Sequence, residues 1–217
     1  MRGIRKGVLG VMILLVLVAG QAFSAESKGK VLVLVRAGIG SDTSFDLADY
    51  AIIKEFGVMK TTLEGAGFNV VVATVDGRAT GGRHILIAPD LKFSDVKIAD
   101  YKGVMVPCLD ASAMTAESVQ IVKDALAAGI PVAAQNGGVS ILSMAGGLKG
   151  KNFAIADFWI TGEGKQWFNP GGGTYKGEGV VQDGKIVTSG ICPVMALFVK
   201  KPDGTQELAQ KLIALMQ

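Results

Sequence analysis

Residues 131–147 read PVAAQNGGVSILSMAGG, and this stretch says more about the fold than any other of its length. An apolar run, PVAA, precedes a polar and glycine-rich corner, QNGG, and the segment after the corner has the character of a helix start. This order predicts a strand-to-helix elbow, the sharp turn on which many hydrolases hold a nucleophile above a sheet. The corner contains no Ser, Cys or Thr. The elbow of this chain therefore lacks a nucleophile of the usual kind.

Three other apolar runs have the composition of strands that are covered on both faces of a parallel sheet. They are residues 30–35 (KVLVLV), 69–73 (NVVVA) and 103–107 (GVMVP). Further along, residues 179–189 (GVVQDGKIVTS) place Asp-Gly between two β-branched runs, which predicts a β-hairpin.

Helical patterns alternate with these runs. Apolar side chains recur at helical spacing in residues 49–64, 115–128 and 206–216. The middle segment has the clearest boundaries, because Thr115 is a suitable N-cap, Glu117 lies in the first turn and Gly129 follows the end. Strands that alternate with helices imply right-handed βαβ units. We therefore predict an α/β fold with a doubly wound, mostly parallel sheet flanked by helices.

The first residues have the pattern of a secretory signal peptide. Arg2, Arg5 and Lys6 precede an uncharged apolar run, residues 8–19, and AFS at 22–24 then places small residues, Ala22 and Ser24, at the two positions that signal peptidase reads. The apolar run is shorter than the roughly 20 residues that a membrane-spanning helix needs. We expect cleavage near Ser24, with an uncleaved anchor as the alternative.

This leader changes what the composition implies. The chain has 22 basic and 19 acidic residues, and removal of residues 1–24 takes away three basic ones, which leaves a formally neutral remainder of about 193 residues. We therefore predict a signal peptide at 1–24 and one domain at 25–217, exported across the inner membrane to the periplasm. A neutral chain gives no support to nucleic-acid binding or to stable membrane association after cleavage.

Several segments occur in a fixed order along the chain, namely VLVLV, LEGAGFNV, ILIAPDLKFSDV, YKGVMVP, IPVAAQNGG, LKGKNFA and VVQDGKIVTS. In that order they resemble the DJ-one/PfpI superfamily, relatives of class I glutamine amidotransferase domains. The resemblance covers most of the chain after the leader. It implies a flavodoxin-like sandwich of one sheet between helices, and members that commonly form homo-oligomers.

The same resemblance shows where this chain departs from the superfamily. Asn136 stands where the superfamily has its elbow cysteine, and residues 107–110 (PCLD) stand where it has PGG. The acidic residue of the first long helix is retained as Glu55. The histidine that many members carry after the elbow is absent, since the one histidine, His84, lies upstream. Asp157 is the nearest polar residue to that position.

These departures lead to our main functional hypothesis. An asparagine amide has no form comparable to a reactive thiolate, so the superfamily chemistry is not expected at the elbow. Backbone N–H groups at the start of a helix still attract anions. We therefore predict a non-catalytic binding or regulatory module for a small anionic or carbonyl metabolite. The predicted ligand-binding residues are Glu55, Asn136, Gly137, Cys108 and Leu109.

The two cysteines leave other hypotheses open. The resemblance places Cys108 and Cys192 at strand ends that border the elbow, where ligands of open α/β sheets bind. They are either joined in a disulfide, which an exported protein permits, or free and inert. Alternatively, one of them is a relocated nucleophile, which would give a hydrolase, a glyoxalase or deglycase-like enzyme, or a redox enzyme. Whether the protein is an enzyme stays open on the sequence alone.

Cofactor and metal sites have no support in the linear sequence. There is one histidine, His84, and no closely spaced pair of ligand residues, so we predict no metal and no cofactor. The aromatic residues Phe158, Trp159, Trp167 and Phe168 lie close together in sequence, and we interpret them as core or subunit packing.

Overall fold

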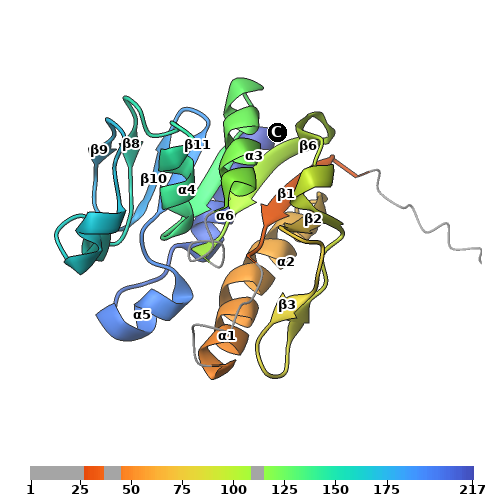
Figure 1. Cartoon of the computed structure of the whole chain (residues 1–217), viewed down its shortest axis with the longest axis horizontal. Helices are drawn as coiled ribbons and strands as arrows, with labels where there is room; N and C mark the ends of the chain where they lie inside the picture. Colours follow the sequence, from red (N-terminus) through yellow and green to blue (C-terminus); the bar gives the residue numbers. More distant parts are fainter. Residues whose placement is uncertain (1–26, 37–44, 109–114) are drawn as a thin grey trace, which may run out of the picture.

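The computed structural model describes residues 27–36, 45–108 and 115–217, which form one central sheet between layers of helices (Figure 1). Neighbouring strands of the sheet run parallel, apart from the antiparallel pair at one edge. From that edge, the strands are β10 (Val180–Asp183), β11 (Ile186–Ser189), β7 (Val132–Gln135), β6 (Tyr101–Val106), β1 (Lys30–Leu34), β2 (Asn69–Thr74) and β5 (Leu91–Lys92). The predicted mostly parallel α/β sheet is confirmed.

Helices cover both faces of this sheet, as the doubly wound prediction requires. On one face lie α6 (Thr205–Met216) and a long helix in three consecutive parts, α1 (Phe45–Ala51), η1 (Ile52–Gly57) and α2 (Val58–Gly65). On the other face lie α3 (Ala116–Ala127) and α4 (Gly138–Met144). A further short helix, α5 (Pro193–Val199), follows β11.

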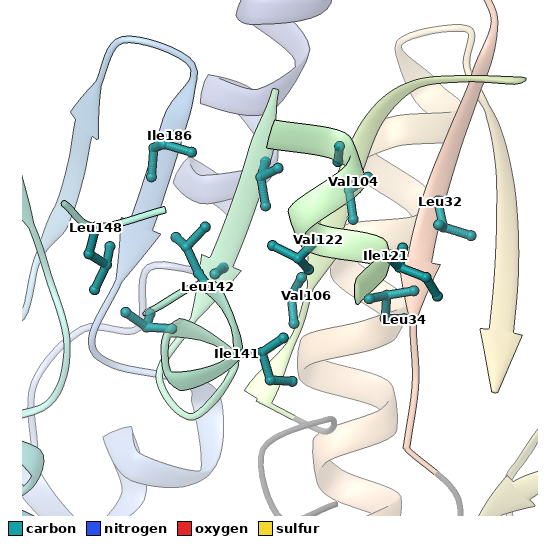
Figure 2. Close-up of a cluster of buried hydrophobic side chains, with 14 of the residues drawn as sticks. Leu32, Leu34, Val104, Val106, Ile121, Val122, Ile141, Leu142, Leu148 and Ile186 are labelled. Atoms are coloured by element: carbon teal, nitrogen blue, oxygen red, sulfur yellow. The ribbon is translucent and has the colours of Figure 1, made fainter. Parts of the chain in front are cut away.

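The alternation of side chains along each strand builds the two core layers. Val31 and Val33 of β1 belong to the layer under the long helix and α6, whereas Leu32 and Leu34 belong to the opposite layer. All four are fully buried. In Figure 2 the second layer is seen between the sheet and two helices, and its labelled members include Leu32, Leu34, Val104, Val106, Ile121, Val122, Ile141 and Leu142. This two-sided burial explains why the buried positions of β1 and β6 are apolar, whereas Lys30 and Lys102 lie at their exposed positions.

Helix α3 follows the predicted boundaries closely. The side chain of Thr115 accepts a hydrogen bond from the Ser118 N–H at 3.1 Å, and the Ser118 hydroxyl accepts one from the Thr115 N–H at 3.2 Å. Glu117 lies in the first turn. After the helix, Gly129 has a φ of 67°, a conformation that glycine adopts at little cost. Thr115 is therefore the predicted N-cap, and the cap is reciprocal.

The β10–β11 hairpin is also confirmed. The two strands pair antiparallel around the Asp-Gly turn, and Gly184 has a φ of 61°. Asp183 at this turn accepts a hydrogen bond from the Asn152 N–H at 2.9 Å, so the hairpin is tied to the adjacent strand β8 (Asn152–Phe153).

Several short elements were not predicted. Strand β3 (Thr80–Gly81) pairs with β4 (Leu86–Ile87), and β8 pairs with β9 (Thr174–Tyr175), each outside the central sheet. Four 3₁₀ turns complete the described connections: η2 (Phe93–Asp95), η3 (Ile98–Asp100), η5 (Asp157–Trp159) and η6 (Glu163–Trp167). Strands of two residues are too short to show a period of hydrophobicity in the sequence.

The predicted signal peptide, residues 1–24, lies outside the described residues. Across the described ranges, no helix combines the length and the apolar character needed to cross a membrane.

Candidate functional site

The predicted elbow joins β7 to α4 at the carboxyl end of the sheet. Asn136 follows the last residue of β7 with a φ of 45°, a left-handed conformation that asparagine tolerates better than most residues. Its carbonyl oxygen accepts the Val139 N–H at 2.9 Å, which starts the helix. At Gly138, an added Cβ would lie 2.3 Å from the Val106 carbonyl oxygen, so only glycine fits there. The elbow is confirmed, and it is packed tightly against the end of β6.

The side chain of Asn136 is held on both sides of its amide. It is 5% exposed, and its Oδ1 accepts a hydrogen bond from the Trp159 indole N–H at 2.8 Å. This bond fixes the direction of the Nδ2 group, which lies 3.4 Å from the Cys108 sulfur and 3.7 Å from the Cys192 sulfur. The asparagine at the elbow therefore donates toward two thiols that other segments bring to it.

Glu55 reaches the same place from the long helix. It lies in η1, a π-helical segment with a wider turn than an α-helix, and its side chain is only 1% exposed. One carboxylate oxygen, Oε1, accepts the Cys108 backbone N–H at 2.6 Å. Burial raises the pKa of Glu55 well above its ordinary value, and the negative charge of a Cys192 thiolate raises it further. The bond from the Cys108 N–H opposes these effects only in part.

Cys192 is the N-cap of α5 and is 2% exposed. Donors near its sulfur favour the thiolate, first the Cys108 thiol and then the Met195 N–H, the Asn136 amide at 3.7 Å and the Val194 N–H, although the side chain makes no capping hydrogen bond to α5. Although burial opposes them, these donors lower the pKa of Cys192 to about 7. Close to neutral pH, a substantial fraction of this thiol is therefore a thiolate.

Cys108 behaves in the opposite way. Its hydrogen bond to Cys192, its burial and the charges of Cys192 and Glu55 raise its pKa, while the Gly137 N–H acts in the other direction. Of the two sulfurs, Cys192 therefore carries the negative charge. Both cysteines are free thiols in this structure, and the disulfide stays a prediction.

The remaining predicted residues are placed as follows. Gly137 turns its N–H toward the Cys108 sulfur, so this part of the expected anion cradle already faces a thiol. The Asn136 N–H is used as well, by the Ser189 carbonyl oxygen at 2.6 Å. Leu109 lies outside the described residues. Asp157 accepts a hydrogen bond from the Tyr175 hydroxyl and is exposed.

Sequence reasoning missed the part that Trp159 plays. The sequence groups it with its aromatic neighbours as packing, and the ring of Phe158 does pack edge-on against it, with centroids 5.3 Å apart. The other two aromatic residues separate: Phe168 is buried against Phe153, whereas Trp167 is 61% exposed. The available signal was position, because Trp159 is two residues from Asp157, which marks the place of the superfamily histidine.

The fold also brings together three residue types that bind metals. A carboxylate oxygen of Glu55 and the sulfurs of Cys108 and Cys192 all lie within 4.8 Å of one another. The linear sequence does not show this cluster, since the three residues come from the long helix, the end of β6 and the start of α5.

Comparison with known proteins agrees with this architecture. The sequence profile of the DJ-1/PfpI family matches residues 44–201, which is most of the chain. An uncharacterized protein of Archaeoglobus fulgidus is 32% identical over 133 residues, or 58% of this chain and 73% of that protein.

Solved structures give the same picture. A ThiJ/PfpI domain protein from Brachyspira murdochii has a TM-score of 0.65 and 17% identity, over 88% of this chain and 96% of that one. DJ-1beta of Drosophila melanogaster has a TM-score of 0.59 and 21% identity, over 86% of this chain and 96% of that one. At these identities the likeness shows a shared fold, while the profile match shows membership. This chain belongs to the DJ-1/PfpI family.

Proposed function

We propose that this protein carries out thiol chemistry on a small carbonyl metabolite, with Cys192 as the nucleophile in place of the missing elbow cysteine. One observation carries the proposal: the Cys192 sulfur faces the Cys108 thiol, the first N–H groups of α5 and the Asn136 amide at 3.7 Å, which together lower its pKa to about 7, the Cys108 thiol most of all. Donors of this kind activate cysteine nucleophiles in general.

The contacts of Asn136 favour this function over ligand binding at the elbow itself. Both ends of its amide are already engaged, by Trp159 on the oxygen and by the two sulfurs on the nitrogen. A ligand that used this amide would first have to displace those contacts. In our proposal Asn136 is a positioning residue that holds the thiolate of Cys192.

The reaction step follows from the two thiols. The Cys192 thiolate attacks the carbonyl carbon, and the electron pair of the C=O double bond moves to oxygen. That oxygen takes the proton of the Cys108 thiol, which gives a thiohemiacetal on Cys192 and a thiolate on Cys108. The two sulfurs lie within 4.8 Å of each other, and their pKa values are shifted in opposite directions, which supports this division of roles.

Turnover of a 2-oxoaldehyde such as methylglyoxal tests the proposal. Activity should be lost in Cys192→Ala and strongly reduced in Cys108→Ala, and alkylation of the wild type by iodoacetamide should titrate near pH 7. Alkylation and turnover that survive Cys192→Ala would refute the assignment. Circular dichroism of each variant checks that the fold is intact.

A non-catalytic binding protein is the second candidate, and two observations favour it. Cys192 is 2% exposed, so a substrate needs some local movement to reach it. A hollow of about 340 Å³ also lies beside the site, and its lining includes Lys54 and Pro193, the neighbours of Glu55 and Cys192 in the chain. Lys54 offers a positive charge to an anionic metabolite, although Asp203 in the same lining opposes it. Thermal stabilisation by such a metabolite, lost in Lys54→Ala and without turnover, would favour this function.

Export to the periplasm is part of the proposal. It is supported by the charge and hydropathy pattern of residues 1–24. Fractionation of the producing cells, with mass spectrometry of the N-terminus, tests it. A full-length chain in the cytoplasm would contradict export.

A further inference from the structure

Glu55, Cys108 and Cys192 converge on one point from three separate parts of the fold. Their ligand atoms lie within 4.8 Å of one another. In a tetrahedral zinc site, bonds of about 2.3 Å to sulfur and 2.0–2.2 Å to oxygen separate neighbouring ligand atoms by roughly 3.5–3.8 Å. Small side-chain movements are therefore enough to bring all three atoms to one ion. We propose that these residues form a binding site for a single Zn²⁺ ion.

The donor set favours Zn²⁺ over other cations. Thiolates select soft or borderline metals and disfavour Mg²⁺ and Ca²⁺, which take oxygen ligands. The third donor here is a carboxylate, and Zn²⁺ accepts sulfur and oxygen together, whereas Cu⁺ is bound best by sulfur alone. Three protein ligands leave a fourth position open, and Cys108, the least buried of the three, marks its side.

The neighbours of the cluster are arranged to hold these ligands. The Cys108 N–H binds Oε1 of Glu55 at 2.6 Å, which orients the carboxylate and leaves Oε2 out of that bond. The Asn136 Nδ2 group lies 3.4 and 3.7 Å from the two sulfurs, as expected for N–H donors that support metal-bound thiolates. Trp159 fixes that amide from its other end at 2.8 Å.

Charge gives a further reason for a cation. When Glu55, Cys108 and Cys192 lose their protons to bind a metal, three negative charges lie within 4.8 Å of one another in a buried site, and their repulsion is offset only by a cation. A divalent cation leaves a net charge of only −1 on the cluster. On binding, each sulfur forms one bond to Zn²⁺ and any thiol proton passes to water.

This metal site adds a means of regulation to the proposed function. Only the predicted effect of zinc on activity rests on that function. A Zn²⁺ ion bound to the Cys192 sulfur withdraws the electron pair that would attack a carbonyl carbon. Zinc would therefore switch the proposed thiol chemistry off. The binding itself requires no activity, and it is measured without any substrate.

Zinc titration of the reduced, metal-free protein against a chromophoric chelator is the direct test. We expect one Zn²⁺ per chain. Cys108→Ser and Cys192→Ser should each weaken binding by at least about 100-fold, and Glu55→Gln by about tenfold. Glu207→Gln, a carboxylate change on α6, is the matched control and should bind as the wild type does.

If a variant fails to fold, the absorption spectrum of the wild type with Co²⁺ in place of Zn²⁺ still tests the site. The wild type alone should show a thiolate-to-cobalt charge-transfer band in the near ultraviolet, and oxidation of the two cysteines to a disulfide should abolish it. Absence of the band, or zinc binding that is unchanged in Cys192→Ser, would overturn the site. Loss of carbonyl turnover with zinc binding intact would defeat only the proposed function.

Discussion

Helix α3 and the long helix that contains η1 differ in regularity and in the polarity of what they bury. Helix α3 follows local rules throughout, with a reciprocal cap at Thr115 and Ser118 and a buried face that includes Ile121 and Val122. In the long helix that runs from α1 to α2, the η1 segment widens into a π turn. That turn carries Glu55, a carboxylate buried at 1% exposure.

This contrast between η1 and α3 distinguishes features that serve the site from features that stabilise the fold. A π turn and a buried carboxylate both cost free energy, and such features are frequent at functional sites. In this chain both occur in the one segment that reaches the Cys108 N–H. Helix α3 makes no contact of this kind in the described residues, and its features serve packing and capping. We therefore expect changes in the two regions to differ in what they alter.

We expect the largest effect, on thiol reactivity, from a substitution at Asn136 that keeps the shape of the side chain. Asn136→Asp retains an oxygen for the Trp159 indole but replaces the donor toward the sulfurs with a negative charge. The pKa of Cys192 should rise from about 7, and alkylation by iodoacetamide at pH 7 should slow by at least about tenfold. Asn169→Asp, in the loop before β9, is the control. Equal alkylation rates in both variants would mean that Asn136 does not hold the thiolate.

The next effect concerns Glu55 and the pH dependence of stability. Because its pKa is raised in the folded state, the folded protein binds this proton more tightly than the unfolded chain does. The free energy of unfolding should therefore fall as pH rises from about 4.5 through the raised pKa, with a slope that approaches about 1.4 kcal/mol per pH unit. Glu55→Gln should remove this fall.

Urea unfolding of the wild type and of Glu55→Gln between pH 4.5 and 6.5 measures that difference. This window avoids Cys192, whose lowered pKa makes stability rise with pH from about 7 toward 9. Glu207→Gln is the matched control, since that residue is exposed. Parallel curves for the wild type and Glu55→Gln would show that the buried carboxylate does not destabilise the fold.

A smaller effect belongs to α3. Thr115→Ala removes one half of the reciprocal cap and should lower the free energy of unfolding by about 1 kcal/mol, without a change in thiol reactivity. Thr61→Ala, at an exposed position in α2, should stay within about 0.5 kcal/mol of the wild type. A slower alkylation of Thr115→Ala at unchanged stability would break the proposed separation between the two regions.

The smallest effect comes from the start of the same helix. Glu117 lies in its first turn, where a negative charge interacts favourably with the helix dipole. Glu117→Gln should lower stability by roughly a few tenths of a kcal/mol at low salt, and this difference should shrink at high salt. Thermal melts at two salt concentrations measure it, and a loss that is independent of salt would exclude the dipole as its cause.

Much of the fold could be predicted from the sequence, because its signals are local. Continuous apolar runs marked β1, β2, β6 and β7, and the Asp-Gly pair marked the hairpin of β10 and β11. Thr115 and Gly129 marked the ends of α3. Neighbours in the chain produce each of these signals. The two-residue strands, such as β3 and β8, escaped prediction because they are held by tertiary contacts.

The candidate site was only partly accessible in the same way. The elbow and its missing nucleophile could be read directly, and the resemblance directed attention to Glu55 and both cysteines. The π turn of η1 and the hydrogen bond from Trp159 to Asn136 had no local signal. A metal site was not expected, because ligand spacing in the sequence says nothing about residues that meet only after folding.

By itself, the sequence determined a parallel α/β sheet and an elbow that holds an asparagine. Hydrophobic periodicity, helix-capping residues and turn residues each depend on a few neighbouring residues, so they can be recognised in the sequence. Only the tertiary structure decided what the elbow faces. Glu55, Cys108 and Cys192 are more than 50 residues apart in sequence. Their polar atoms approach one another because folding brings the long helix, the end of β6 and the start of α5 together at the carboxyl end of the sheet.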